Sequence, residues 1–155
     1  MWFEDAPLGE KVTLGSYTFT TDNIIAFAKK YDPQPFHLDA EAAAHSPYGG
    51  LIASGWHTSV VWMKLMIAHR NARVAAGEEL TQVNYVSPGV RDIRWLKPVR
   101  PGMTLTYTNE NCAKRDWPSL PAFGLLEGNN EARTEDGTLV YTFVNRVLIA
   151  RKPTK

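Results

Sequence analysis

The stretch LIASGWHTSVVWMKLMIA, residues 51–68, decides the fold of this 155-residue chain. It is the longest apolar stretch, but it contains a lysine and several hydroxyl side chains, whereas a membrane-spanning helix needs about 20 predominantly apolar residues. The pattern therefore predicts a buried helix of a soluble protein, which runs from near Ser54 to Ala76 and is ended by Gly77. Because residues 60–67 are apolar almost all round, we expect other structure to enclose this helix on several sides.

Upstream of this helix, the sequence predicts one strand followed by an amphipathic helix. Apolar residues mark the strand, at Val12, Leu14, Tyr17 and Phe19. Gly15 lies among them and permits a bulge or bend. Thr20 or Thr21 is placed to cap a helix over residues 22–31, whose apolar residues recur at three- and four-residue spacings.

Two prolines follow this first helix. Pro33 and Pro35 are expected to end it and to stiffen an extended loop, because proline fixes its own backbone and disfavours a helix before it. Asp39 is placed to cap a short helix that runs through Ala44. Residues 47–50, PYGG, then form the loop that leads toward the long helix.

Downstream of Gly77 the pattern changes to strands. Five candidates are expected, at Thr81–Ser87, Val90–Leu96, Met103–Cys112, Phe123–Arg133 and Thr138–Ile149. The last is the clearest, because its apolar residues fall mainly on one face at period two. Residues 135–137, EDG, are a natural hairpin turn before it. The predicted fold class is therefore α+β, with one long apolar helix packed on a largely antiparallel sheet in a single domain over residues 1–155.

The composition excludes several classes of protein. Lys and Arg number 17 against 16 Asp and Glu, and the resulting charge of +1 argues against a nucleic-acid partner, which usually requires a basic excess. The single cysteine, Cys112, cannot form an internal disulfide or a thiolate-rich zinc site. Because no signal-peptide pattern or membrane span is visible, we expect a cytoplasmic protein without a membrane partner.

The segment YDPQPFHLD, residues 31–39, brings an acid and an imidazole close together. Asp32 and His37 lie on a proline-restrained loop and can approach one water molecule, so that one group accepts a proton while the other donates one. Structural interpretations stay open: Asp32 can simply end the preceding helix, and His37 can be a packed core histidine. Asp39 is better explained as a helix cap, although a metal site with His37 is a further alternative.

The segment GGLIASGWH, residues 49–57, leads into the start of the long helix. Unpaired backbone amides and the positive end of the helix dipole can bind a polarised carbonyl there, and Gly55 has no side chain to obstruct its approach. The alternative is that Ser54 is only an N-cap and Gly55 only a packing position. The glycine spacing does not match a dinucleotide-binding fingerprint, and His57 is better explained as a packed residue than as a catalytic one.

Taken together, these two segments resemble the MaoC-like dehydratases, relatives of the (R)-specific enoyl-CoA hydratases. The family pattern is Asp, any residue, Asn, Pro, any residue, His, followed later by His-Gly at the start of a long helix. Residues 32–37, DPQPFH, and residues 54–55, SG, fill these places, and residues 94–102 resemble the strand pair that follows. Two residues depart from the pattern, since Gln34 replaces the usual Asn and Ser54 replaces the usual His.

The resemblance implies a hotdog fold, in which a curved antiparallel sheet wraps around a long central helix, with an active site near a homodimer interface. It implies reversible syn hydration of a trans-2-enoyl-CoA thioester, with Asp32 and His37 holding the water and the Gly55 amide polarising the carbonyl. Substrate contacts are then expected at Gln34, Ser54 and Trp56. No separate cofactor or metal is implied, because coenzyme A is part of the substrate. A hotdog thioesterase and a non-catalytic acyl-thioester-binding module are the alternatives.

Overall fold

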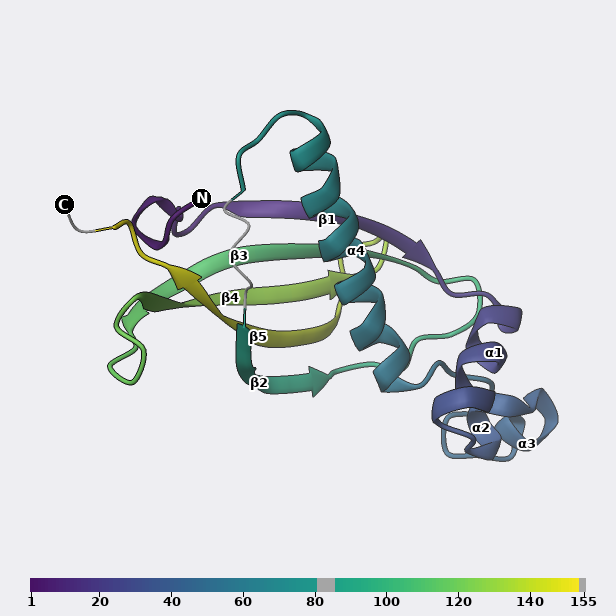
Figure 1. The fold of residues 1–155 in the computed structure, drawn as a ribbon. Helices are drawn as coiled ribbons and strands as arrows, with labels where there is room; N and C mark the ends of the chain where they lie inside the picture. Colours follow the sequence, from purple (N-terminus) through teal and green to yellow (C-terminus); the bar gives the residue numbers. More distant parts are fainter. Residues whose placement is uncertain (81–85, 154–155) are drawn as a thin grey trace.

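The computed structural model of the chain describes residues 1–80 and 86–153, in which one long helix crosses a five-stranded sheet (Figure 1). In chain order, the elements are η1 Phe3–Asp5, β1 Lys11–Thr18, α1 Thr21–Tyr31, α2 Pro35–Leu38, α3 Ala40–Ala44, α4 Gly55–Ala75, β2 Val86–Trp95, β3 Thr104–Asp116, β4 Phe123–Arg133 and β5 Leu139–Ala150. The strand order is β1-β3-β4-β5-β2, and every neighbouring pair is antiparallel. The predicted α+β class and hotdog arrangement are confirmed.

Local sequence signals account for the start of the chain. The register of β1 against β3 shifts between Thr13 and Gly15, where a bulge is predicted. Thr20 caps α1, because its hydroxyl accepts the Asn23 N–H while the Asn23 side chain accepts the Thr20 N–H. Phe19, which we expected in the strand, lies beyond its end and is fully buried.

Two predictions about element boundaries are wrong. The segment after Pro33 is not an extended loop, since Pro35 begins the helical turn α2. Proline is compatible with the first position of a helix, because the N–H that it lacks would have no acceptor there. The two strands expected at Thr81–Ser87 and Val90–Leu96 are one strand, β2, within the described residues, and residues 81–85 lie outside them. Register shifts along β2 accommodate the residues between the two expected strands.

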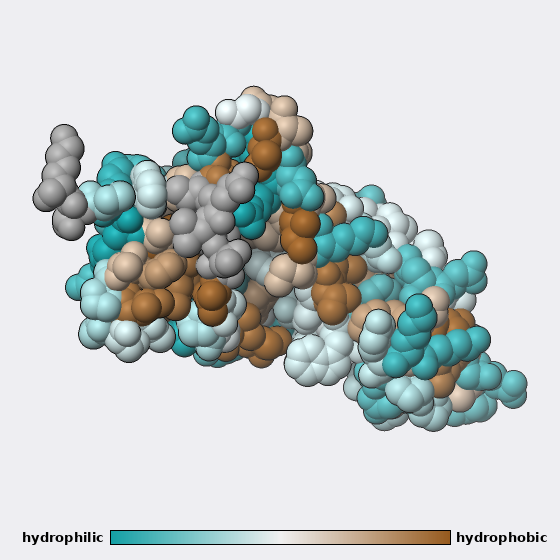
Figure 2. Space-filling view, in the orientation of Figure 1, coloured by the Kyte–Doolittle hydropathy of each residue, from teal (hydrophilic) through white to brown (hydrophobic). Residues whose placement is uncertain are grey.

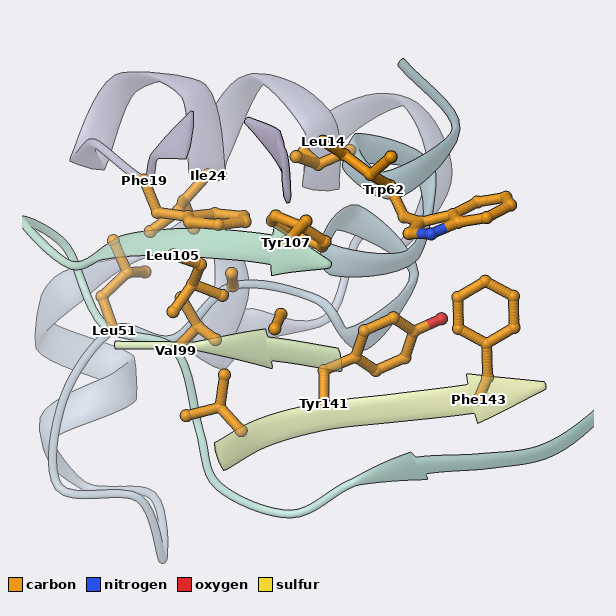
Figure 3. Close-up of a cluster of buried hydrophobic side chains, with 14 of the residues drawn as sticks. Leu14, Phe19, Ile24, Leu51, Trp62, Val99, Leu105, Tyr107, Tyr141 and Phe143 are labelled. Atoms are coloured by element: carbon orange, nitrogen blue, oxygen red, sulfur yellow. The ribbon is translucent and has the colours of Figure 1, made fainter. Parts of the chain in front are cut away.

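The main core lies between α4 and the sheet (Figure 3). Its largest buried side chains come from β1, the segment before α1, α4, β3 and β5, and include Leu14, Phe19, Trp62, Leu105, Tyr107, Tyr141 and Phe143. The Trp62 indole N–H donates to the Asn130 side chain at 2.8 Å, so the one polar atom of this ring is satisfied inside the core. These contacts fix α4 on the sheet and thereby fix the position of its first turn.

Enclosure of α4 on several sides is not observed. Val60, Met63 and Ile67 are about half exposed, at 48%, 51% and 50%, and apolar residues are visible along the outward side of the helix (Figure 2). The reason is geometric, because one sheet covers one side of a helix and the opposite side needs a second layer.

His57 is buried on α4 among aromatic rings. Its imidazole stacks on Phe27 with ring centroids 4.6 Å apart, and its Nδ1 has no hydrogen-bond partner among the described residues. Burial lowers the pKa of His57 from its ordinary value to about 4. The folded protein therefore favours the neutral imidazole, as expected for a packed histidine.

Acid should destabilise the fold through His57. An unfolded histidine titrates near pH 6.5, so the stabilising contribution of the neutral ring is complete above that pH and is lost as the pH falls toward 4. We expect this loss to reach about 3 kcal/mol, and His57→Phe, which keeps an aromatic ring, should remove it. Urea unfolding between pH 7 and pH 4 measures the difference, with His45→Gln at an exposed histidine as the control. Equal pH dependence in the parent and His57→Phe proteins would contradict the assignment.

Candidate functional site

A cavity of about 420 Å³ lies where the first turn of α4 meets α2 and the end of β2. Of the predicted site residues, it is lined by Asp32, Gln34, His37, Gly55 and Trp56, and the structure therefore brings these together. Ser54 is fully buried and does not line the cavity. Much of the remaining lining is apolar or aromatic and includes Phe36, Tyr48, Ile52, Trp95, Leu96, Pro98 and Val99. A concave apolar site with a few converging polar groups is typical of small-molecule binding.

Asp32 is held at the end of α1 by two hydrogen bonds to its carboxylate. Ser54 Oγ donates to Oδ2 at 2.6 Å, and Gln34 Nε2 donates to Oδ1 at 2.7 Å. Burial raises the pKa of Asp32, but the donors from Ser54 and Gln34 and the neighbouring His37 together outweigh it and hold the pKa below its usual value. The carboxylate is therefore ionised at neutral pH and acts as an acceptor.

His37 lies on α2 with both ring nitrogens in defined environments. Its Nδ1 is 2.8 Å from the carbonyl oxygen of Ile52, and because a carbonyl can only accept, Nδ1 carries the proton. Its Nε2 lies 3.3 Å from Oδ2 of Asp32. With a proton on Nε2 as well, His37 donates to Asp32, and without it the Nε2 lone pair lies beside the carboxylate, so the two groups are placed to hold one proton between them.

Ser54 precedes α4 but does not cap it through its side chain. Its hydroxyl instead donates to Asp32, which lies 22 residues earlier in the chain. Its backbone carbonyl accepts the His57 N–H at 3.0 Å, which closes the first turn of the helix. Ser54 thus connects the start of α4 to the acid, and the interpretation of its side chain as only an N-cap is wrong.

Gly55 is the first residue of α4, so its N–H has no acceptor within the helix. A Cβ at this position would lie 2.7 Å from the indole atoms of Trp95, a distance that real side chains do not reach. Glycine is therefore required for packing against Trp95, whatever the backbone amide binds. Trp56, the next residue, is 55% exposed and meets Trp95 edge to face, with centroids 5.2 Å apart.

Sequence reasoning missed Trp95, which lines the cavity and donates from its indole N–H to the Gly55 carbonyl at 2.8 Å. The two residues are 40 positions apart, on β2 and α4. No local pattern connects them, and the only available signal was an aromatic residue at the end of a predicted strand.

The metal alternative finds no support in the described residues. Asp39 accepts the Ala42 N–H at 2.8 Å and caps α3, as its sequence position predicts. Across residues 1–80 and 86–153, His, Cys, Asp and Glu side chains form no group of three placed to ligate a metal ion. Within the same ranges, none of the helices has the length and apolar character needed to cross a bilayer.

Comparisons with known proteins connect this geometry to a family. The sequence profile described as the MaoC like domain matches residues 4–122. The MaoC-like dehydratase from Rhodospirillum rubrum is similar along its whole length, with 30% identity, 99% of both chains covered and a TM-score of 0.82. A monoamine oxidase regulatory protein from Archaeoglobus fulgius is 27% identical, with 99% and 96% of the two chains covered and a TM-score of 0.80.

Two further similarities concern the fold and part of the sequence. The (R)-hydratase from A. caviae, involved in PHA biosynthesis, shares the fold at a TM-score of 0.68 and 24% identity, over 97% of this chain and 99% of the other. The uncharacterized protein YdeM of Bacillus subtilis is 30% identical over 90 residues, which span 57% of this chain and 64% of that curated relative. Since the family profile covers most of the sequence and whole-length structures share the fold, the chain belongs to the MaoC-like family of dehydratases and hydratases.

Proposed function

We propose that this protein catalyses reversible syn hydration of trans-2-enoyl-CoA thioesters, with residues 1–155 as one hydratase domain. The observation that carries the proposal is the pairing of Asp32 and His37 at 3.3 Å on the wall of an otherwise largely apolar cavity. One ionised carboxylate and one imidazole with a fixed tautomer are the groups needed to activate a water and to move its proton.

When Nε2 of His37 carries no proton, the pair presents two acceptors to a single water molecule. A water that donates one hydrogen to Asp32 and the other to Nε2 of His37 directs its oxygen lone pair away from the pair and toward the substrate. When that oxygen bonds to C3 of the enoyl group, one water proton passes to the pair and a proton is returned from it to C2. Because both transfers take place on the face where Asp32 and His37 lie, the addition is syn.

Gly55 supplies the complementary electrophilic group in this proposal. Addition of water at C3 moves an electron pair toward the thioester oxygen, which develops enolate charge before C2 is protonated. The free N–H of Gly55 and the positive end of the α4 dipole stabilise negative charge at this position. We assign Gln34 and Ser54 to holding Asp32, while Trp56 forms part of the wall that contacts the substrate.

A paired assay on crotonyl-CoA tests the proposal. Loss of the enoyl absorbance without release of free thiol is the expected result for a hydratase. Release of thiol would instead support a hotdog thioesterase. If neither signal changes while coenzyme A thioesters still bind, the protein is a binding module and the proposed activity is wrong.

Removing the Ser54 hydroxyl should move the pH dependence of activity. Ser54→Ala takes away a donor that favours the Asp32 carboxylate, so the pKa of Asp32 rises and activity is lost at a higher pH as the solution is acidified. We expect turnover at neutral pH to fall by at least about tenfold, because a hydrogen bond to a charged group contributes about 1.5–3 kcal/mol. The acidic limb of kcat/KM measures the shift, with Ser46→Ala outside the cavity as the control. If the acidic limb of kcat/KM stays at the same pH in Ser54→Ala, Ser54 does not lower the pKa of Asp32.

We also propose that the protein is a homodimer. The edge strand β2 is exposed along nearly all of its length, and the outward side of α4 carries exposed apolar side chains. Unpaired strand edges and apolar patches favour association, and a two-fold pair is the commonest closed form. Sedimentation at micromolar concentration should give twice the 17.4 kDa chain mass, whereas a stable monomer would contradict the proposal.

A further inference from the structure

We propose that Trp95 is a positioning residue for the backbone amides that begin α4, and that it acts through a hydrogen bond to the Gly55 carbonyl. The inference rests on the proposed function in so far as those amides bind the thioester oxygen. The structural part of the inference, that the indole fixes the first turn of the helix, stands apart from the reaction and is tested separately below.

The Gly55 carbonyl has several donors directed at it. Trp95 Nε1 donates at 2.8 Å, Thr58 Oγ1 at 2.6 Å and Ser59 Oγ at 3.2 Å. The two hydroxyls belong to α4 itself, so Trp95 supplies the bond that connects this peptide group to the sheet. The first turn of any helix frays easily, because its N–H groups have no partners within the helix. The hydrogen bond from Trp95 therefore opposes fraying at the start of α4.

The indole ring is itself held in place. It meets Trp56 edge to face at 5.2 Å and lies nearly parallel to Tyr141, at 6.3 Å and 24°. Trp95 and Tyr141 are also register partners of β2 and β5, and Tyr141 is only 2% exposed. The Trp95 side chain therefore connects Gly55 to the buried centre of the sheet and fixes its position.

The same bond affects the strength of the amides. The Gly55 carbonyl and the Trp56 N–H belong to one peptide group, so donors on the oxygen polarise the group and make that N–H a stronger donor. Trp56 is the second helical residue, and its N–H, like that of Gly55, has no acceptor within α4. Trp95 thus favours two adjacent donors at the place where enolate charge is proposed to develop.

A conservative substitution separates this role from that of a passive wall. Trp95→Phe keeps an aromatic ring and removes the N–H donor. We expect kcat on crotonyl-CoA to fall by about tenfold, the effect of one net hydrogen bond. KM should stay within about twofold, because the interaction strengthens in the transition state rather than in the bound substrate. Trp117→Phe, on the loop after β3 and outside the cavity, is the matched control and should leave both constants unchanged. A raised KM with unchanged kcat would make Trp95 only a wall and overturn the inference.

A double-mutant cycle on stability tests the structural part without reference to activity. Gly55→Ala places a Cβ against the indole and should lower the urea midpoint of the otherwise unchanged protein. In a Trp95→Ala background the obstruction is absent, so the same substitution should lower the midpoint much less. This non-additivity is the expected result for residues in direct contact. Additive effects would overturn the inference, even if hydration is observed. Inactivity of the parent protein on crotonyl-CoA would instead reject the proposed function. The double-mutant cycle would still test the structural part, because urea midpoints do not depend on activity.

Discussion

Asp32→Asn and His37→Gln are each expected to lower turnover on crotonyl-CoA by roughly 10²–10⁴-fold, the range of general acid–base catalysis. Both substitutions keep the approximate shape of the side chain and remove its proton chemistry. Asparagine cannot accept the water proton that a carboxylate accepts, and glutamine offers no imidazole at the position 3.3 Å from Asp32. Steady-state kinetics on the purified variants measures the loss.

Matched substitutions nearby distinguish chemistry from general disturbance. Asp39→Asn makes the same change at a helix cap, where asparagine serves as well as aspartate, and should keep parental turnover. His45→Gln makes the change at an exposed histidine and should be equally silent. Circular dichroism verifies that each variant folds. A folded Asp32→Asn or His37→Gln protein with near-parental hydratase activity would show that its assigned role is wrong.

Gly55→Val is expected to lower turnover by about 10²–10³-fold, the usual cost of losing one oxyanion donor. Two effects combine, since the new side chain displaces the Trp95 indole and, in the proposed reaction, obstructs the approach of the thioester oxygen to the amide. Displacement of Trp95 accounts for about tenfold if its hydrogen bond contributes as proposed. A larger loss is therefore assigned to the amide itself.

The control for this substitution is Gly50→Val, on the loop before α4. A Cβ there meets only the end of the flexible Arg100 side chain, at 3.3 Å, and Gly50 does not line the cavity. We expect a folded Gly50→Val protein with near-parental turnover. If Gly55→Val also folds and keeps its turnover, the amide of Gly55 is excluded from the mechanism.

Sequence reasoning succeeded where the determining interactions are local. The caps at Thr20 and Asp39 and the bulge near Gly15 are decided by residues a few positions apart, and the structure shows them as predicted. The approach of His37 to Asp32 belongs to the same class, because five positions and a single helical turn separate the two. Patterns of this range are visible in a sequence because the chain itself keeps the partners close.

Contacts between distant segments were not predictable in the same way. Ser54 reaches Asp32 across 22 positions, and Trp95 reaches Gly55 across 40. Both contacts depend on the orientation of α4 on the sheet. The sequence pattern predicts that the helix packs on the sheet but does not predict its orientation. The prediction that α4 is enclosed on several sides was wrong for a related reason. Apolar residues such as Met63 indicate that a helix surface favours burial, but they do not indicate which element buries it.

The proposed catalytic groups and one part of the cavity wall come from separate stretches of chain. Asp32, His37 and Gly55 lie within 24 consecutive residues, 32–55, whereas residues 95–99 supply another part of the lining from the end of β2 and the loop after it. Substitutions at residues 96–99 can therefore reshape one part of the cavity wall without touching the proposed catalytic groups, although Phe36, Tyr48 and Ile52 shape the wall from the same stretch as those groups. Within this division Trp95 is the exception, because a residue that shapes the wall also supports the helix start. We expect divergence in substrate range to begin at residues 96–99 and to reach Trp95 last.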